Sequence, residues 1–543
     1  MHSIEHMFDV KITGLRLVAP HCANPPDWCI RITKPTQTIS TRPTGASTRQ
    51  PSAGRQRPQL NPCAALGDID AALGRICSPL GRIRAEIRSQ PDSDAPVGRI
   101  GSGTHQSGGL DQERTNRAGS LGRRERHARA CGLMTLVGNA SGHVGPLSHI
   151  RICDLSGQLA GAGATRILAM FGAQIIRIED PVTKGLWDIV RSLGPAINGD
   201  LTNEGGSGFN NHNVEKFGIT LNLRTERGRE LLTKLVTVSD AVTENFSADV
   251  MTRLGFGYER LRELRPDIVY VSNCGFGQEG PYRRFKSWGP VAQAVSGMTF
   301  ASGLPDLEPA GWGYSYMDHT GAYLMAIALL AGLVHRSRTG EGQWIDMSCT
   351  EAGAALAGPA MLDSTVNGRA MRRGGRPNSN RSDSPRMVPH GVYPTAEPDR
   401  WIAIACTTNE AWTRLAPVIG WHDGDRFADE DAVDTAVRAH TTMRTRAELV
   451  ETLTPLGLAV TPVRTPPERI DSDDAREWGL FPTVHHSKHG DLRVDGLPVH
   501  LSRTDWHAER GGPMLGEDTE RVLTELLDVD PSEIPTLREQ GVI

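Results

Sequence analysis

The sequence has no hydrophobic run long enough to cross a membrane. Its longest, Ala322–Val334, has about 13 residues, whereas a transmembrane helix needs about 20. The N-terminal residues MHSIEHMFDV lack the apolar stretch of a signal peptide. We therefore expect no membrane partner and a cytoplasmic location, and we interpret Ala322–Val334 as a buried core helix.

Metal-binding and disulfide patterns are also missing. The nine cysteines include no CxxC pair and form no cluster with histidine. Their odd number is typical of free thiols in a reducing compartment. Cys153, Cys274, Cys349 and Cys406 lie in apolar, strand-like surroundings, so we interpret them as small core residues. No metal site and no tightly bound cofactor are expected.

Charge of one sign does not dominate the chain. Lysine and arginine total 59 and aspartate and glutamate total 63, which gives a net charge of -4. Nucleic acid is therefore not an expected partner of the whole chain. A basic N-terminal arm is the one segment that favours nucleic acid, but it lacks interleaved aromatic residues and any known binding motif.

Residues 1–145 show no helix or strand period. Stretches such as TRPTGASTRQPSAGRQRP are rich in Arg, Ser, Pro and Gly. Such segments bury too little apolar surface to offset chain entropy, so we expect disorder. We favour an extension outside the native reading frame, with the native start at Met134, over a genuine disordered tail that binds an anionic partner. A transit peptide is a third interpretation, against which several acidic residues count.

From about residue 150, apolar runs of strand length alternate with helical patterns. A βαβ unit is predicted from strand Arg151–Ser156, a small-residue loop Gly157–Gly163, helix Ala164–Gly172 and strand Gln174–Asp180. Further strands are expected at Asp240–Phe246, Ile268–Asn273 and Trp344–Cys349, and further helices at Thr225–Leu235, Tyr258–Leu264 and Thr320–His335. This alternation predicts an α/β fold whose mostly parallel sheet is covered on both faces.

The composition divides the ordered part of the chain into three regions. Residues 146–375 are expected to form the large domain and residues 386–465 a smaller α/β domain that contains strand Trp401–Cys406. Residues 466–543 are expected to return to the large domain and to end near helix Thr519–Leu527.

A glycine pair after the first strand resembles part of a dinucleotide-binding motif. Gly161 and Gly163 stand between a strand and a helix, and Glu179 closes the next strand. The third glycine of the motif is replaced by Arg166. We therefore favour a packing role, in which the glycines let the helix approach the sheet.

Asp318 lies just before the long apolar helix. Such an aspartate is commonly an N-cap or a partner of the helix dipole. The same placement keeps a carboxylate ionised and oriented, and the nearby Gly321 leaves space in front of it. An ionised, oriented carboxylate beside open space is a usable nucleophile. The pattern alone leaves both interpretations open.

Five segments occur in a fixed order: RICDLSGQLAGAGATRILAMFGAQIIRIED, KFGITLNLRTERGRELL, DAVTENFSADVMTRLGFGYERLRELRPDIVYVSNCGFGQEGPY, MDHTGAYLMAIALLAGLVHRSRTGEGQWIDMS and PMLGEDTERVLTELL. From about residue 150 to the end, this series resembles the family III CoA-transferases. That superfamily includes formyl-CoA and carnitine CoA-transferases and 2-methylacyl-CoA racemases. The resemblance implies a Rossmann-like large domain, a smaller domain and an interlocked homodimer.

The resemblance also implies the site. It places the catalytic nucleophile on Asp318 and contacts to coenzyme A on Ser156, Leu159, Ala160, Leu221, Asn222, Leu223, Arg224, Asn245, Phe246, Arg253 and Lys286. The three cations of this set are suited to phosphate groups. A surface salt bridge is the structural alternative for each of them.

The chain departs from the family at three places. Leu159 replaces a glutamine of the oxalate enzyme, and Asp180 replaces a basic residue. Both changes disfavour oxalate as the acceptor. The glycine-rich loop of the small domain is represented only in part, by Gly374 and Gly375.

The implied function is transfer of coenzyme A from an acyl-CoA donor to a carboxylic acid through a covalent intermediate on Asp318. A racemase is the alternative, but its catalytic histidine aligns with Trp288, whose indole has no basic nitrogen. A non-catalytic CoA-binding protein is a third possibility, which the presence of Asp318 opposes. Trp288, Tyr314 and Tyr316 suggest a pocket for a bulky acid.

Overall fold

The structure is a computed structural model that describes residues 138–303, 307–312, 314–371, 380–383, 385–422 and 424–543. The expectations for residues 1–137, and those for Gly374 and Gly375, lie outside the described residues.

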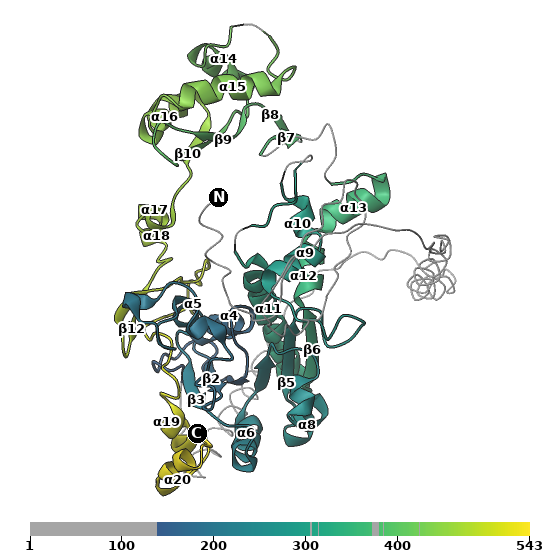
Figure 1. Ribbon diagram of the computed structural model, residues 1–543, viewed down its shortest axis with the longest axis vertical. Coiled ribbons are helices and arrows are strands. Elements are labelled where there is room, and N and C mark those ends of the chain that lie inside the picture. The colour runs from purple at the N-terminus through teal and green to yellow at the C-terminus, as the bar shows by residue number, and fades with distance from the viewer. Residues whose placement is uncertain (1–137, 304–306, 313, 372–379, 384, 423) are drawn as a thin grey trace, which may run out of the picture. The chain divides into compact units, whose positions relative to one another are not determined.

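A six-stranded, entirely parallel sheet forms the centre of the fold, in the order β3-β2-β1-β4-β5-β6 (Figure 1). Its strands are β1 (Arg151–Asp154), β2 (Gln174–Glu179), β3 (Phe217–Thr220), β4 (Ala241–Glu244), β5 (Val269–Cys274) and β6 (Gln343–Ser348). The predicted α/β fold with a parallel, Rossmann-like sheet is therefore confirmed. In this order the direction of winding reverses between β1 and β4, which is where such sheets bind ligands.

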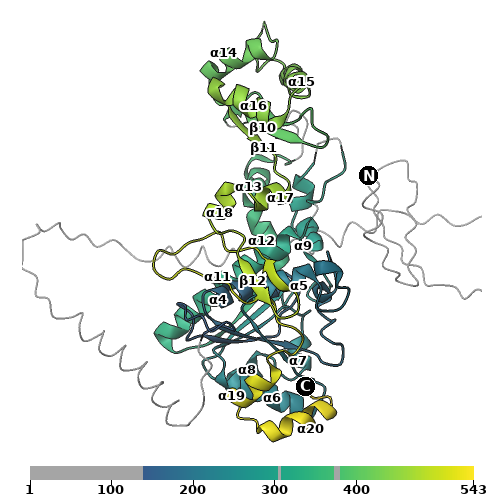
Figure 2. The same cartoon turned by 90° about the vertical axis from the view of Figure 1, so that its left-hand side faces the viewer.

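Helices cover both faces of the sheet (Figure 2). On one face α4 (Ala160–Met170) and α11 (Tyr316–Thr339) bury Leu168, Met325 and Leu329 against the strands. On the other face lie α6 (Glu226–Val238), α8 (Tyr258–Leu264), α19 (Thr519–Glu525) and α20 (Ile534–Glu539). Burial on both faces explains the consecutive apolar residues within β5, whereas the edge strand β6 alternates between partly buried and exposed residues.

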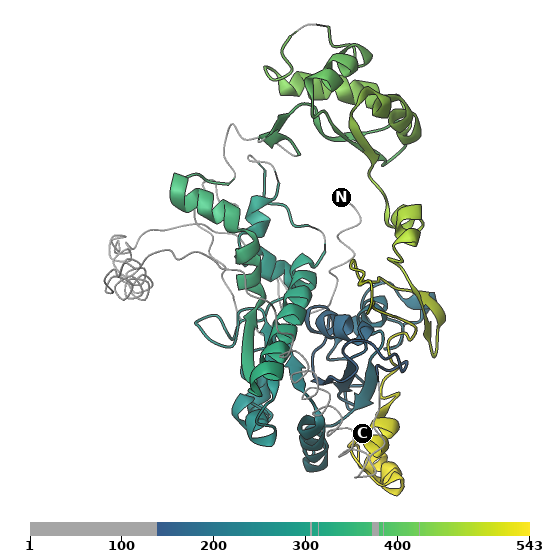
Figure 3. The same ribbon diagram turned by 180° about the vertical axis from the view of Figure 1, so that it is seen from behind.

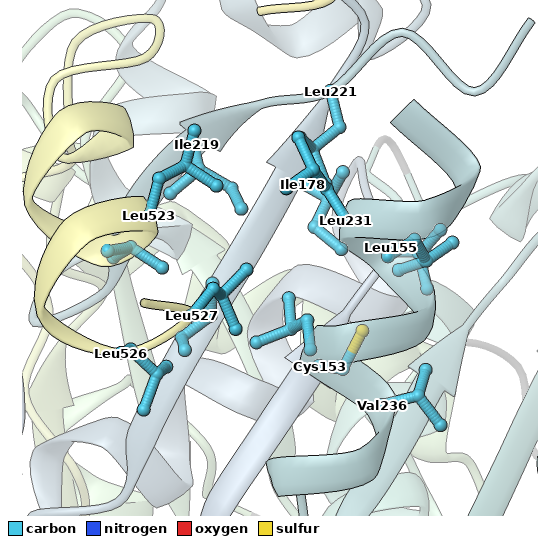
Figure 4. Packing of buried hydrophobic residues seen from close by; sticks show 14 of the residues in the cluster. Cys153, Leu155, Ile178, Ile219, Leu221, Leu231, Val236, Leu523, Leu526 and Leu527 are labelled. Carbon is cyan, nitrogen blue, oxygen red and sulfur yellow. The ribbon is translucent and has the colours of Figure 1, made fainter. Parts of the chain in front are cut away.

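The second face is packed by residues far apart in the sequence. Leu231 from α6 and Leu523 from α19 belong to one cluster with Cys153, Ile178 and Ile219 of the sheet (Figure 4). The C-terminal segment therefore supplies part of the hydrophobic core on this face of the six-stranded sheet.

The same C-terminal segment, yellow in Figure 3, lies beside the sheet. Hydrogen bonds fix it to strand β3. Asp518 Oδ2 accepts from Gly218 N at 2.9 Å, and Thr519 Oγ1 accepts from Thr220 N at 3.0 Å. Beyond the strand, Asn222 N donates to Val542 O at 2.7 Å. These bonds hold the chain end against the edge strand of the sheet.

Helix α4 begins earlier than predicted. It starts at Ala160, so Gly161 and Gly163 lie inside its first turn and not in a loop. A Cβ atom on Gly161 would lie 2.4 Å from Ser156 Cβ, and one on Gly163 would lie 3.0 Å from Ala322 Cβ. The close approach of the helix to its neighbours outweighs the low helix propensity of glycine. The two glycines thus allow close packing, which is the role that we favoured over dinucleotide binding.

Helix α11 is longer than predicted and is buried on one face only. Among the described residues, it is the one helix long and apolar enough to cross a membrane by length and composition, a test that core helices also pass. Tyr323, Ile327 and Val334 on its other face are exposed by 47%, 62% and 46%. The interpretation of Ala322–Val334 as a buried core helix therefore holds for the face that packs on the sheet and not for the opposite face.

A smaller antiparallel sheet with its own hydrophobic cluster follows later in the chain. Its strands, in the order β11-β10-β9, are β9 (His390–Pro394), β10 (Trp401–Ala405) and β11 (Ala459–Pro462). Helices α14 (Asn409–Val418), α15 (Glu430–Thr441) and α16 (Arg446–Leu453) pack on this sheet.

Short elements complete the described chain. They are α5 (Ser207–His212), α7 (Val250–Arg253), α9 (Gly289–Val295), α10 (Met298–Ala301), α12 (Cys349–Leu356), α13 (Gly358–Asn367), β7 (Ser382–Asp383), β8 (Arg386–Met387), α17 (Pro466–Ile470), α18 (Asp473–Glu477), β12 (Thr483–His486) and β13 (Gly490–Arg493), with single 3-10 turns at Ile189–Arg191, Ile197–Gly199, Thr454–Leu456 and Pro531–Glu533.

Candidate active site

Two loops are joined where the winding of the sheet reverses. Gly157, after β1, donates its backbone N–H to Asn245 Oδ1 at 2.8 Å, and Asn245 Nδ2, after β4, donates to Gly157 O at 2.9 Å. A Cβ atom on Gly157 would lie 2.4 Å from the ring of Trp187, so only glycine fits there. The paired bonds fix the backbone that borders the expected ligand site.

The buried carboxylate of Asp154 holds the loop that follows β1 through hydrogen bonds. Asp154 accepts from Ser156 N at 3.0 Å and from the hydroxyls of Thr165 at 2.7 Å and Thr243 at 3.0 Å. The Ser156 hydroxyl also donates to Asp154. Lys216 lies 3.4 Å from the same carboxylate, and burial lowers the pKa of this lysine to about 7. Because its hydroxyl is occupied, Ser156 shapes the loop and does not face a ligand with that group.

A second buried charge contacts the loop through its backbone. Arg177 donates to Ser156 O at 2.7 Å and lies 2.5 Å from Asp188 Oδ2. The charges of Glu179 and Asp188 raise the pKa of Arg177 although burial lowers it. The guanidinium therefore stays charged and holds the loop carbonyl in place.

Asp318 is the third residue of α11 and lines a cavity of about 300 Å³ at the carboxyl ends of β1, β4 and β5. Ala160, Asn245, Phe246 and Lys286 line the same cavity. The structure thus brings five residues of the predicted site around one space, although they come from four separate parts of the sequence.

The carboxylate of Asp318 is held by its neighbours. The backbone N–H of Gly289 and the hydroxyl of Ser315 donate hydrogen bonds to it, and the charge of His319 favours its ionised form. Burial nevertheless raises the pKa of Asp318 above its ordinary value. A helix N-terminus by itself lowers the pKa of a carboxyl group. Here the pKa of Asp318 is raised instead, because removal from water outweighs the stabilising contacts.

The glycine next to the Asp318 carboxylate is Gly289 and not Gly321, the glycine that the sequence suggested. A Cβ atom on Gly321 would lie 2.9 Å from Cys349 Sγ, so Gly321 permits close packing against that cysteine. A Cβ atom on Gly289 would lie 2.3 Å from Asp318 Oδ2. Gly289, at the start of α9, therefore leaves the room that the carboxylate occupies.

The buried cysteines include two at this cavity. All four described cysteines are free and buried, and Cys274 and Cys349 line the space beside Asp318. Burial raises the pKa of Cys349 to about 12, so its thiol stays protonated near neutral pH. The described residues include no group of three or more His, Cys, Asp or Glu that could hold a metal ion.

A second cavity of about 270 Å³ adjoins the first. The two share Trp187 and Phe246, whose ring centroids lie 5.2 Å apart. Leu221, Asn222, Leu223 and Arg224, all predicted contacts, line this second cavity. Sequence reasoning missed Trp187; the one signal for it was an aromatic residue in the polar loop after β2.

The cations of the predicted site differ in their positions. Arg224 is 69% exposed and forms an ion pair of 3.5 Å with Asp180. Lys286 is exposed at the wall of the Asp318 cavity. Arg253 is exposed and lines neither cavity. Ser156, which is buried, and Leu159, which is partly buried, also line neither cavity.

Three aromatic residues were expected to form an acid pocket. Trp288 lines the Asp318 cavity and is 53% exposed. Tyr314 and Tyr316 are not among the residues that line it; Tyr316 packs on Trp312 with ring centroids 4.4 Å apart. The expectation of a three-residue aromatic pocket is therefore met by Trp288 alone.

The fold and the site together define a Rossmann-like α/β protein that has two adjoining cavities at the reversal of its sheet and a carboxylate in one of them. The family model of CoA-transferase family III matches residues 147–519. The chain belongs to this family.

Curated relatives agree with this assignment. The succinyl-CoA–L-malate CoA-transferase alpha subunit of Chloroflexus aurantiacus is 30% identical over 73% of this chain and 92% of its own. The succinate–glutarate CoA-transferase of Agrobacterium fabrum is 30% identical over 72% of this chain and 98% of its own. A CAIB/BAIF family protein from Brucella suis has a similar crystal structure, with a TM-score of 0.63, 26% identity and coverage of 70% of this chain and 99% of its own. The protein is thus a CoA-transferase.

Proposed function

We propose that the enzyme moves coenzyme A from an acyl-CoA to a carboxylic acid through a covalent intermediate on Asp318. The observation that carries this proposal is the position of the Asp318 carboxylate. It lines the cavity at the reversal of the sheet, is oriented by Gly289 and Ser315, and lies so close to Gly289 that a Cβ atom there would displace it. An oriented carboxylate in such a place is suited to nucleophilic catalysis.

The proposed reaction has four steps. A carboxylate oxygen of Asp318 attacks the thioester carbonyl of the donor, which forms a mixed anhydride and releases CoA thiolate. The thiolate attacks the aspartyl carbonyl, releases the donor acid and forms an aspartyl-CoA thioester. The acceptor carboxylate attacks this thioester, giving a second anhydride and the thiolate. The thiolate then takes the acceptor acyl group, and Asp318 is restored.

The two cavities suit the two ends of an acyl-CoA. We propose that the nucleotide end lies in the cavity lined by Arg224 and that pantetheine passes Trp187 and Phe246 to reach Asp318. Because the ion pair of Arg224 with Asp180 is exposed, it is weak and a phosphate group can replace it. Lys286, and Arg253 on α7, are exposed cations that a long ligand can also reach.

The names of the relatives suggest which acids to test. They are named for succinate, glutarate and L-malate, and one from Acetobacter aceti for oxalate. All are dicarboxylic acids, so we propose that a dicarboxylic acid is among the substrates of this enzyme.

Substitution of the nucleophile tests the mechanism. Asp318→Asn keeps the size of the side chain and is expected to lower transfer between succinyl-CoA and a panel of dicarboxylic acids by at least about 1000-fold, while the Kd for free CoA stays within about twofold. Hydroxylamine should trap an Asp318 adduct, visible by peptide mass spectrometry, in the unsubstituted enzyme alone. The exposed Asp528→Asn is the control. Full transfer by the Asp318→Asn enzyme would show that the mechanism is wrong.

We also propose that a second copy of the chain covers the exposed face of α11. Exposed apolar side chains occur on α11 and on the two helices that follow β6: Tyr323 and Ile327 on α11, Leu356 on α12, and Leu362 and Val366 on α13. An exposed apolar area of this kind favours a subunit interface, and the family resemblance implies a homodimer. Light scattering of the unsubstituted chain is expected to give a dimer, and Ile327→Glu is expected to lower the apparent mass; a folded monomer of the unsubstituted chain would contradict this.

A further inference from the structure

Gln158 has an unusual backbone conformation at the Asp318 cavity. Its φ is 55°, in the left-handed region that glycine adopts readily and glutamine rarely does. Seven described residues other than glycine have a positive φ, and Gln158 is the one among them that lines this cavity. Strained residues that persist at a ligand site are often part of the function of the site.

The neighbouring residues force this conformation. On one side Gly157 exchanges two hydrogen bonds with Asn245, at 2.8 and 2.9 Å. Just before it, Ser156 O accepts from Arg177 at 2.7 Å, and Ser156 N donates to Asp154 at 3.0 Å. On the other side helix α4 begins at Ala160. The loop is therefore fixed at both ends, by the hydrogen bonds of Ser156 and Gly157 and by the start of α4. The left-handed conformation of Gln158 connects these two fixed ends.

The side chain of Gln158 makes no hydrogen bond among those that the structure describes, although the residue is partly buried. Leu159, the contact that the resemblance implied, does not line the cavity. Among the other lining side chains, the amide of Asn273 accepts from Cys349 Sγ at 3.2 Å and contacts Met325 Sδ at 3.6 Å. The amide of Gln158 thus has both its donors and its acceptor available beside Asp318.

We propose that Gln158 is a specificity-determining residue, whose side-chain N–H groups bind an oxygen of the transferred acid beside Asp318. This inference rests on the proposed transferase mechanism. The bound oxygen belongs to the carboxylate of the free acid and, once the acid is esterified to CoA, to the thioester carbonyl. Because the loop fixes the backbone of Gln158 before any ligand arrives, little backbone entropy is lost when the amide binds.

The test compares three substitutions in the full chain. Gln158→Met keeps the length of the side chain and removes the amide; Gln158→Glu replaces its donors with a negative charge near Asp318; Gln158→Gly removes the side chain and the strain. The exchange of carbon-13-labelled succinate into succinyl-CoA supplies kcat and KM, calorimetry supplies the Kd for free CoA, and thermal denaturation supplies the Tm.

For Gln158→Met we expect kcat/KM for succinate to fall about 10- to 100-fold, the range for a lost hydrogen bond to a charged group. Gln158→Glu is expected to lose more, because its charge repels the acid. The Kd for free CoA should stay within twofold in all three. Gln158→Gly is expected to lose activity like Gln158→Met and yet to raise the Tm, because glycine tolerates the backbone conformation.

A matched control separates strain from chemistry. Asp528 also has a positive φ, of 53°, is exposed and does not line the Asp318 cavity. Asp528→Gly is expected to raise the Tm while leaving kcat/KM unchanged.

The outcomes distinguish this inference from the mechanism. If the unsubstituted enzyme exchanges succinate and Asp318→Asn abolishes the exchange, then a Gln158→Met enzyme within twofold of the unsubstituted one overturns the role of Gln158 alone. An equal loss of CoA affinity also overturns it, since the loop would then contact CoA and not the acid. If succinate is not exchanged, glutarate, L-malate and oxalate are used in turn, and failure of all four overturns both proposals.

Discussion

Gly289 and Asp318 approach each other so closely that a methyl group on Gly289 would lie 2.3 Å from Asp318 Oδ2. Gly289 also donates its backbone N–H to this carboxylate. The first residue of α9 therefore fixes both the position and the orientation of a side chain on α11. Carboxylate placement at this site depends on a glycine that carries no chemistry of its own.

Gly289→Ala should consequently damage catalysis more than folding. The added methyl group displaces the Asp318 carboxylate, and misplacement of a reacting group by about 1 Å costs on the order of 100-fold in rate. We expect kcat for acyl exchange to fall by about that factor, measured with succinyl-CoA and labelled succinate.

Gly358→Ala is a closely matched control. Gly358 also starts a helix, α13, and also precedes a proline, but a Cβ atom there would meet nothing within 4 Å. This substitution is expected to leave kcat and Tm unchanged. An active Gly289→Ala enzyme, or an equal loss in both variants, would contradict the role assigned to Gly289.

The sequence allowed prediction of the strands but not of the contact at Gly289. Runs such as Ile268–Asn273 stand out because a strand buried on both faces has consecutive apolar residues, here Ile268 to Val271. Gly289 is far from Asp318 in the sequence, and only the packing of α9 on α11 brings the two together. The start of α4 was also misjudged, since glycines signal loops unless a tertiary contact requires them, as one does at Gly161.

The site was predicted best where its residues follow strands directly. Asn245 and Phe246 come just after β4, and the carboxyl ends of parallel strands meet at one edge, so their place at the cavity follows from the fold. Arg253 lies on a separate short helix, and whether it lines a cavity depends on how α7 leaves the strand, since Val250 and Leu254 line the second cavity and Arg253 does not. Neither that path nor the position of Trp187 is encoded in a local pattern.

The two hydrogen bonds between Asn245 and Gly157 predict a requirement for the asparagine amide. Asn245→Ala removes both bonds and frees the loop after β1 from the loop after β4. We expect the Kd for free CoA, measured by calorimetry, to rise about tenfold, the equivalent of about 1.4 kcal/mol.

Asn245→Asp refines this test, because it keeps an acceptor for Gly157 N and loses the donor to Gly157 O. An intermediate Kd is expected. Asn203→Ala is the control: it removes an exposed amide that donates to Lys184 O at 3.0 Å, and the Kd should not change. Unaltered CoA binding in Asn245→Ala would show that the joined loops do not border the CoA site.

The buried pair Asp154 and Lys216 should be strongly coupled. Both side chains are fully buried, 3.4 Å apart, and Lys216 also donates to Ala162 O at 2.8 Å. Below about pH 7, where Lys216 carries its charge, Lys216→Met leaves the Asp154 carboxylate buried without its cation, so we expect a loss of about 3–5 kcal/mol in the free energy of unfolding. The double substitution with Asp154→Asn should lose less than the sum of the two single ones; additive losses would contradict the coupling.

The pH dependence of this pair has a definite sign. Burial lowers the pKa of Lys216 from 10.5 to about 7, so the folded state sheds a proton that the unfolded state keeps between these values. The contribution of Lys216 to stability therefore increases as the pH rises from about 7 to about 10.5. Denaturant unfolding at several pH values is expected to show this increase in the unsubstituted chain and not in Lys216→Met.

Glu244, at the end of β4, gives the opposite sign. Burial raises its pKa from 4.5 to about 7, and its carboxyl group accepts from Phe246 N at 2.6 Å and from Tyr270 Oη at 2.9 Å. The folded state thus binds a proton more tightly than the unfolded state does. Its contribution is fully present below about pH 4.5 and is lost as the pH rises to about 7.

Glu244→Gln removes this loss, because a glutamine oxygen still accepts from Phe246 N and its amide N–H can donate to Tyr270. We expect the free energy of unfolding of Glu244→Gln, relative to the unsubstituted chain, to grow between about pH 4.5 and 7 and to stay level above that. The change should be about 3.5 kcal/mol, at about 1.4 kcal/mol per unit of pKa over about 2.5 units. Glu263→Gln, on the exposed side of α8, controls for the loss of a carboxylate. A difference between Glu244→Gln and the unsubstituted chain that stays constant across this window would show that Glu244 does not titrate there.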